Sequence, residues 1–368
     1  MKISIHQTLS GPDLQAYQDF LWSAAHQHPR QDPRFESSDV ADGLAVRYVF
    51  GRIDGQIRAV ALFTLRPHPW IKGAFAEAIS LGGPVCDDAG EMVAFVEAVR
   101  RAPEFARVGV VRITPYWLDG AAQALRDALA AAAGWTPFES DAYRQTGLVD
   151  LTPTTEGLMT TFSTTARRKI RKCEREGITF NNCTDEAEAL DFLERLNKMR
   201  VSRGLSLVKE AGFMASFRDV YRHADIGVLI IARHQGHFVA GNQSFRSTRT
   251  AHLGHFCTDE IRLRAAGDLR IAPISCLQEM KWASAKGCRV YDLEGYREDA
   301  AADDRLYNIY KYKAEFHPSP AQRMPGHGRV VNRFLYVTGN ARDIVKPHVK
   351  AVLKRLSRKP VKVSKPDE

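Results

Sequence analysis

The stretch that decides the fold covers residues 227–257, GVLIIARHQGHFVAGNQSFRSTRTAHLGHFC. Its first apolar run, 227–232, has the length of a strand, and a Gln235-Gly236 turn separates it from a second run at 238–245. A third run follows at 250–257. Short apolar runs divided by glycine turns are typical of neighbouring antiparallel strands. We therefore predict a hairpin followed by a third strand.

The residues after this hairpin complete one structural unit, and the same order of elements occurs earlier in the chain. A helix is expected at 269–285 and a further strand at 289–293. The earlier counterpart has an Asp54-Gly55 turn, and its elements are expected at 45–51, 57–65, 74–81, 90–101 and 108–113. In both copies about 55 residues separate the turn glycine from the middle of the last strand. This agreement indicates a duplication.

The duplication predicts an α/β protein with two tandem domains, each a mixed, largely antiparallel sheet flanked by helices. We place the first domain at 1–150 and the second at 151–340, because Asp150-Leu151-Thr152-Pro153 interrupts the chain. Residues 341–368 are expected to form a basic helix and a disordered tail. This tail is suited to gripping RNA, to lying on an anionic membrane surface, or simply to keeping the protein soluble.

Composition restricts the class of protein. The 368 residues carry a net charge of +9, which favours a polyanionic partner but also fits an ordinary basic protein. No apolar run approaches the length of a membrane span and no secretory signal is present, so we expect a cytoplasmic protein. The six cysteines lack the spacing of a disulfide framework or a metal site. We expect no metal and reduced cysteines.

Residues 155–176 form the most highly charged predicted helix. One face is apolar, with Leu158, Phe162, Ala166, Ile170 and Cys173 at steps of three and four. The other face carries six cations within nine residues, namely Arg167, Arg168, Lys169, Arg171, Lys172 and Arg175. Such a face either binds phosphates or is a solvated surface partly balanced by Glu174 and Glu176.

A second charged pattern follows the last predicted strand. The segment YDLEG at 291–295 ends that strand with an acid and a glycine, and KYKAEF at 311–316 follows after an aromatic residue. A lysine beside a backbone turn suits the stabilisation of an anion, although Lys313 also fits a solvated helix position. Asp292 is suited to act as a general base or to cap the turn, and we favour the capping role.

These segments resemble the Fem-type (FemABX) aminoacyl-tRNA-dependent peptidyltransferases. STTARRKIRKCEREG at 163–177 is similar to the helix that opens the second domain in that family, and 291–316 to its closing segment. GGPV at 82–85 and MRVSRG at 199–204 are weaker matches. The resemblance covers about residues 20–320 and implies tandem GCN5-related acyltransferase (GNAT-like) domains, in the compact, FemX-like form that lacks a coiled-coil arm.

The resemblance also implies an activity and a set of site residues. The activity is transfer of an amino acid from aminoacyl-tRNA to an amine acceptor, such as a peptidoglycan precursor or another envelope or small molecule, with no metal or organic cofactor. The implied catalytic residues are Lys313, Tyr312 and Asp292, with Tyr312 stacking on the terminal adenine or on the lysine stem. Substrate or tRNA binding is assigned to Arg167, Arg168, Lys169, Arg171, Lys172, Arg203, His255, Glu294 and Gly83. The departures Glu294 and Glu315 mark where specificity is expected.

Three points remain open at this stage. A CoA-dependent N-acyltransferase of the same fold needs a glycine-rich phosphate loop, and the nearest stretch, RAAGDL at 264–269, has leucine where a small residue belongs. A non-catalytic RNA-binding protein would keep the fold without the chemistry. The acceptor, expected to be phosphate-bearing or an amine, and a peripheral membrane contact stay undecided. A monomer is favoured.

Overall fold

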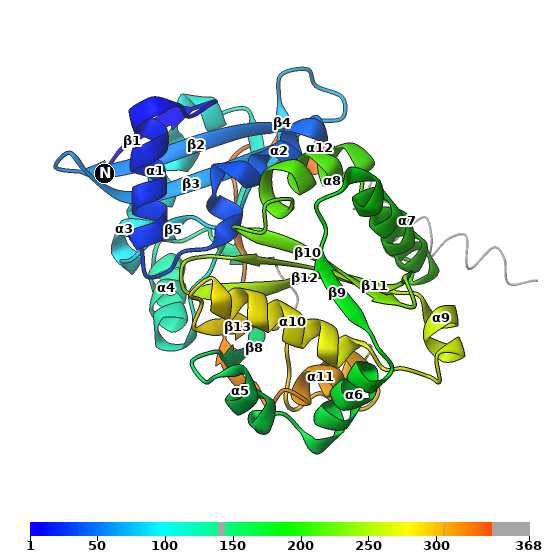
Figure 1. Cartoon of the computed structure of the whole chain (residues 1–368). Coiled ribbons are helices and arrows are strands. Elements are labelled where there is room, and N and C mark those ends of the chain that lie inside the picture. The colour runs from blue at the N-terminus through cyan, green and yellow to red at the C-terminus, as the bar shows by residue number, and fades with distance from the viewer. Residues whose placement is uncertain (139–143, 305, 341–368) are drawn as a thin grey trace, which may run out of the picture.

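The computed structural model describes residues 1–138, 144–304 and 306–340 and contains two mixed β-sheets with helices on both faces (Figure 1). The predicted duplication is confirmed. In the first copy the hairpin of β2 (Ala45–Ile53) and β3 (Gln56–Pro67) leads to β4 (Phe75–Gly82), helix α3 (Ala89–Arg101) and β6 (Val108–Pro115), which pairs parallel with β4. In the second copy the hairpin of β10 (Gly227–His234) and β11 (His237–Arg246) leads to β12 (Thr250–Thr258), helix α10 (Ala272–Ala285) and β13 (Val290–Asp292), which pairs parallel with β12. The fold class is therefore the predicted one.

The first sheet has the strand order β1-β2-β3-β4-β6-β15-β7, with β5 paired to β3. Helix α1 covers one face and helices α3 and α4 cover the other, because alternate strand residues are apolar on both faces. Its elements are β1 (Lys2–His6), α1 (Gly11–Ser23), α2 (Glu36–Ala41), β2 (Ala45–Ile53), β3 (Gln56–Pro67), β4 (Phe75–Gly82), β5 (Val85–Cys86), α3 (Ala89–Arg101), β6 (Val108–Pro115), α4 (Asp119–Ala131), β7 (Thr136–Pro137), β15 (His327–Val330) and α12 (Arg333–Gly339).

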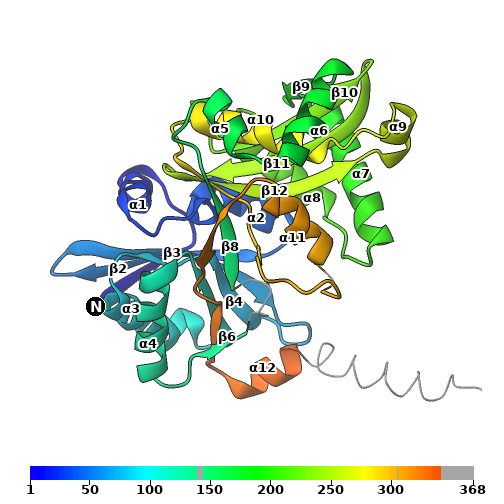
Figure 2. The same ribbon diagram turned by 90° about the horizontal axis from the view of Figure 1, so that it is seen from below.

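The second sheet has the order β14-β8-β13-β12-β11-β10-β9. Helices α5, α6 and α10 pack on one face and α7 and α8 on the other (Figure 2). Its elements are β8 (Gln145–Asp150), α5 (Thr155–Thr161), α6 (Thr164–Arg175), β9 (Thr179–Asn182), α7 (Glu186–Ser202), α8 (Glu210–Ser216), β10 (Gly227–His234), β11 (His237–Arg246), β12 (Thr250–Thr258), α9 (Glu260–Ala265), α10 (Ala272–Ala285), β13 (Val290–Asp292), α11 (Tyr307–Ala314) and β14 (Ser319–Gln322).

The two sheets exchange strands across the boundary predicted between residues 150 and 151. Strand β8 precedes this boundary but pairs with β13 and β14 of the second sheet. Strand β15 lies far beyond it but pairs with β6 and β7 of the first sheet. A domain boundary at residue 150 therefore does not separate the two sheets. The irregular segment after Asp150 ends strand β8 but does not end the first domain. The predicted tail, 341–368, lies outside the described residues.

The charged helix predicted at 155–176 is two helices. Helix α5 ends at Thr161, and the Ser163 side chain accepts a hydrogen bond from the Ala166 N–H at 3.1 Å, which starts α6. The predicted apolar stripe is confirmed, because Leu158, Phe162, Ala166, Ile170 and Cys173 all belong to the core of the second domain.

Two further expectations concern the compartment. All six cysteines lie among the described residues and are buried and free of disulfides. Over the described parts of the chain, helices with both the length and the apolar character of a membrane span are absent.

Candidate functional site

A buried polar centre lies where the two domains meet, and Asp292 at the end of β13 is its anchor. Its carboxylate accepts hydrogen bonds from the Tyr116 hydroxyl at 2.7 Å, from the Thr146 hydroxyl, and from the Glu294 N–H at 2.7 Å. Tyr116 comes from the end of β6, so both domains hold this one side chain. Burial, followed by the charge of Glu294, raises the pKa of Asp292. These three donors fix the orientation of the Asp292 carboxylate, and its role in catalysis stays a prediction.

Glu294 is the exposed group of this centre. Its backbone has φ +56°, a left-handed conformation that a glycine adopts without strain, as at the corresponding position of the Fem-type pattern. Its carboxylate lies 2.9 Å from Nδ1 of His252 and 3.8 Å from the guanidinium of Arg323, and the side chain is 32% exposed. Burial acts to raise the pKa of Glu294, but the hydrogen bond to His252 and the charges of His252 and Arg323 lower it overall.

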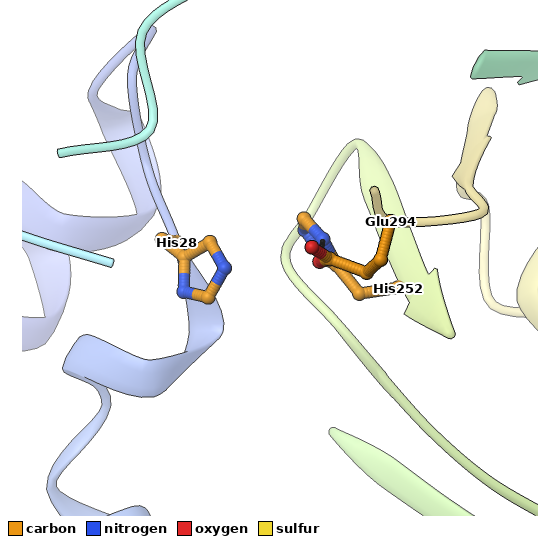
Figure 3. Close-up of side chains that lie close together, drawn as sticks. All are labelled: His28, His252 and Glu294. Atoms are coloured by element: carbon orange, nitrogen blue, oxygen red, sulfur yellow. Dashed lines mark hydrogen bonds and ion pairs between the residues drawn. The ribbon is translucent and has the colours of Figure 1, made fainter. Parts of the chain in front are cut away.

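His252 lies behind Glu294 and is fully buried among aromatic rings. Its ring centroid is 4.7 Å from that of His28, 5.0 Å from Tyr116 and 5.5 Å from the stacked ring of Phe245. Its Nε2 has no hydrogen-bond partner among the described residues. Burial and then the nearby charge of His252 hold the pKa of His28 well below its ordinary value. Figure 3 shows His28 facing the His252–Glu294 pair from the other domain.

Lys313 and Tyr312 are neighbours on α11, but their side chains contact different parts of the protein. The Lys313 ammonium donates to the carbonyl oxygens of Glu294 and Gly295, both at 2.8 Å, and burial lowers its pKa to about 8. Lys313 therefore holds the turn that presents Glu294. The Tyr312 hydroxyl instead donates to the Ala272 carbonyl at 3.1 Å, and its ring packs edge-on against Phe316. Tyr312 thus lies in the core of the second domain, and its predicted stacking role stays a prediction.

Two lysines of the predicted basic helix make contacts within the protein. Lys169 pairs with Glu315 at 2.5 Å, and Lys172 donates to the Gly267 carbonyl at 2.6 Å. Glu315, the second departure from the Fem-type pattern, therefore faces α6. Arg168, Arg171 and Arg175 are exposed and Arg167 is partly exposed. A pocket of about 330 Å³ is lined by Arg167, Arg171 and Lys281 of α10 together with Glu156 and Glu174.

The remaining predicted residues lie away from Glu294. His255 lines a separate pocket of about 230 Å³ together with Arg30 and Lys209. Arg203 follows the last turn of α7 and is exposed. Gly83 packs so closely on Gln31 that a Cβ atom there would lie 2.3 Å from the Gln31 side chain, which indicates a packing role.

Four residues of the centre were not among the predicted site residues, namely His28, Tyr116, His252 and Arg323. Two of them carried a signal in the sequence. Tyr116 follows the last strand of the first copy as Glu294 follows that of the second, so the duplication itself pointed to it. His252 lies on the same strand as His255, and a register shift in the pairing of β11 with β12 separates their positions.

Comparisons with known proteins agree with this architecture. Residues 161–313 match the family described as an acetyltransferase (GNAT) domain. The crystal structure of FemX superposes with a TM-score of 0.76 at 14% identity, covering 91% of this chain and 99% of that one. L-PGS from Bacillus licheniformis gives 0.53 at 16% identity, covering 89% and 95%. A tandem GNAT protein from the clavulanic acid biosynthesis pathway gives 0.52 at 14% identity, covering 90% and 99%.

A search of curated protein sequences found no match. The matches that were found show a tandem GNAT fold, and the resemblance to the Fem-type family is confirmed at the level of that fold. The matched GNAT domain spans α6 to β13 and most of α11, which includes Asp292, Glu294 and Lys313.

Proposed function

We propose that this protein is an acyltransferase that moves an aminoacyl group from aminoacyl-tRNA to an amine acceptor. The observation that carries the proposal is the partly exposed Glu294 carboxylate, which is backed by His252 and whose backbone is held by Lys313, within the matched GNAT domain. Acyl transfer to an amine needs a group that holds and deprotonates the nucleophile, and this is the exposed acid of the buried centre.

The reaction can be written with these side chains. The acceptor arrives as an ammonium ion, which Glu294 binds through its negative charge and from which it takes a proton. The neutral amine then attacks the ester carbonyl carbon, a C–N bond forms, and the ester C–O bond breaks. The ribose oxygen leaves and receives the second proton, which the nitrogen loses as the amide forms. His252 is a positioning residue that orients the Glu294 carboxylate, and the Lys313 ammonium fixes its backbone.

The loop at the position where this fold would bind a CoA pyrophosphate lacks the features of a phosphate-binding loop. Its structure therefore supports a donor other than acetyl-CoA. Anion binding at a helix N-terminus uses free backbone N–H groups. In residues 266–269, all four N–H groups donate to carbonyl oxygens of residues 262–264. The adjoining helix α10 has Pro273 in its first turn, which supplies no N–H, and Asp268 adds a negative charge. These features support aminoacyl-tRNA over acetyl-CoA and require no organic cofactor.

The outward cations of α6 support an RNA donor as well. Arg167, Arg168 and Arg171 lie on the domain that carries Glu294, and a basic face of this kind binds phosphates by releasing counterions. Charged tRNA is a cytoplasmic substrate, so this proposal includes a cytoplasmic location.

The pocket beside His255 supports an acceptor that carries an anionic group as well as its amine. Arg30 of the first domain lines it, as does Lys209 of the second, which pairs with Asp42 of the same lining at 3.6 Å. Burial and then the charges of Arg30 and Arg200 lower the pKa of His255 to about 4. The Arg30 guanidinium lies 5.0 Å above the Phe245 ring, which stacks on His252. A phosphate- or carboxylate-bearing amine, such as a cell-envelope precursor, fits this arrangement.

The test is a transfer assay with two labelled donors. The wild-type protein is incubated with aminoacyl-tRNA or with acetyl-CoA, and the label is followed into amines that carry a phosphate or carboxylate group. We expect transfer from aminoacyl-tRNA. Transfer from acetyl-CoA alone would show that the donor is wrong. Binding of tRNA without transfer from either donor would favour a non-catalytic RNA-binding protein.

A further inference from the structure

One cluster in the centre combines Glu294 and His252 with His28, to which the acyl-transfer proposal gives no role. His28, His252 and Glu294 each offer one ligand atom, and these three atoms lie within 4.8 Å of one another (Figure 3). We propose that the cluster binds one divalent transition-metal ion, of the zinc type, between the two domains. The three ligands come from positions far apart in the chain, so no short sequence motif predicts the site.

The geometry of the two imidazoles carries the first part of the argument. The His28 Nδ1 accepts the Arg30 N–H at 3.2 Å, which fixes the ring and leaves Nε2 as the nitrogen open to a ligand. The His252 Nδ1 lies 2.9 Å from the Glu294 carboxylate, so Nδ1 is the nitrogen that can share an ion with that carboxylate. With one atom of His28 they make a set of three ligand atoms that lie within 4.8 Å of one another.

The carboxylates carry the second part. Glu294 is within 2.9 Å of His252, which is close to the spacing of neighbouring ligands on one ion, and Asp292 lies 3.8 Å from the same imidazole. The positive charge of Arg323 disfavours a bound cation, because its guanidinium lies 3.8 Å from the second carboxylate oxygen of Glu294. Lys313 adds a second positive charge nearby, where it donates to the Glu294 carbonyl. Two imidazoles and one carboxylate suit zinc, cobalt or iron rather than magnesium or calcium, which prefer oxygen ligands.

Occupancy has a consequence that rests on the proposed function. A metal bound to Glu294 takes the carboxylate that the acceptor ammonium needs, so metal binding should inhibit transfer. The 32% exposure of the Glu294 side chain gives an ion a route to the cluster from solvent. Metal binding itself does not depend on the reaction, so the two proposals fail separately.

The test is a titration of the chelator-treated protein with Co²⁺, followed by visible absorption and by metal stoichiometry after dialysis. His28→Asn keeps an acceptor for the Arg30 N–H but lacks the second nitrogen, and His252→Phe removes both ring nitrogens while keeping an aromatic ring beside Phe245. The matched control is His237→Asn at the exposed first residue of β11. We expect one ion per chain, an affinity at least about tenfold weaker in both cluster variants, and no change in the control.

Absence of stoichiometric Co²⁺ binding would overturn the proposal, as would unchanged affinity in a folded His28→Asn variant. If the variants do not fold, X-ray absorption on the Co²⁺-loaded wild-type protein decides. Two imidazole nitrogens and a carboxylate oxygen around the ion support the site, and fewer than two imidazoles contradict it.

Discussion

Glu279 should make the stability of this protein fall as pH rises, and Glu279→Gln should abolish that part of the dependence. Glu279 lies on α10 with 1% of its surface exposed, and the Tyr291 hydroxyl donates to its carboxyl group at 2.9 Å. Burial raises its pKa from the ordinary value of 4.5 to about 8, against the hydrogen bonds from Asn242 and Tyr291. The folded protein therefore keeps a proton that the unfolded chain releases.

The direction of this pH dependence follows from the number of protons that the folded and unfolded states bind. Between pH 4.5 and pH 8 the folded state binds more protons at Glu279 than the unfolded state does. The contribution of Glu279 to the free energy of unfolding is therefore fully present below pH 4.5 and is lost by about pH 8. The slope is about 1.4 kcal/mol per pH unit, and the loss between pH 5 and 8 is about 4 kcal/mol.

The assay is urea unfolding at intervals from pH 5 to 9, with reversibility checked at each pH. The difference in free energy of unfolding between wild type and Glu279→Gln isolates this one group, since glutamine keeps the size and the acceptor for Tyr291. The exposed Glu176→Gln serves as the control. A wild-type-minus-variant difference that stays flat within about 0.5 kcal/mol would refute the reasoning.

Three further predictions follow from individual contacts. Lys313→Met leaves the Glu294 and Gly295 carbonyls unpaired, so urea unfolding should show a loss of about 1–3 kcal/mol; unchanged stability would contradict the role of Lys313 in the turn. Replacing Arg168 and Arg171 with Gln should reduce the slope of log tRNA affinity against log salt by about 1.5, measured by filter binding, and an unchanged slope would remove these residues from the interface. Gly82→Ala places a Cβ 2.1 Å from the His28 ring at φ +69°, so the melting temperature should fall by several degrees, about 2 kcal/mol or more; an unaltered melting temperature would show that His28 is not tightly packed.

The order of elements could be predicted because it is encoded locally. Both hairpin turns have the glycines that a positive φ requires, with Gly55 at +81° and Gly236 at +79°. The strands around them carry buried apolar residues in the expected places. The exchange of β8 and β15 between the sheets could not be predicted this way, because strand pairing depends on which edges meet after both domains form.

The same distinction explains the site. Asp292, Glu294 and Lys313 lie in one segment whose pattern is visible in the sequence, and the structure brings them together. His28 and Arg323 reach the centre from segments near opposite ends of the chain, and packing between domains determines their position. The break between α5 and α6 was missed for a related reason, since the apolar stripe continues across it.

The central claim is that Glu294 deprotonates the acceptor amine. The most direct test is the single-turnover rate of transfer from saturating aminoacyl-tRNA in Glu294→Gln, with the exposed Glu298→Gln as control and tRNA affinity measured in parallel. The account predicts a fall of about 10²-fold or more in the rate for Glu294→Gln, with tRNA affinity unchanged and the control equal to wild type. A Glu294→Gln rate within a factor of about two of wild type would contradict the account.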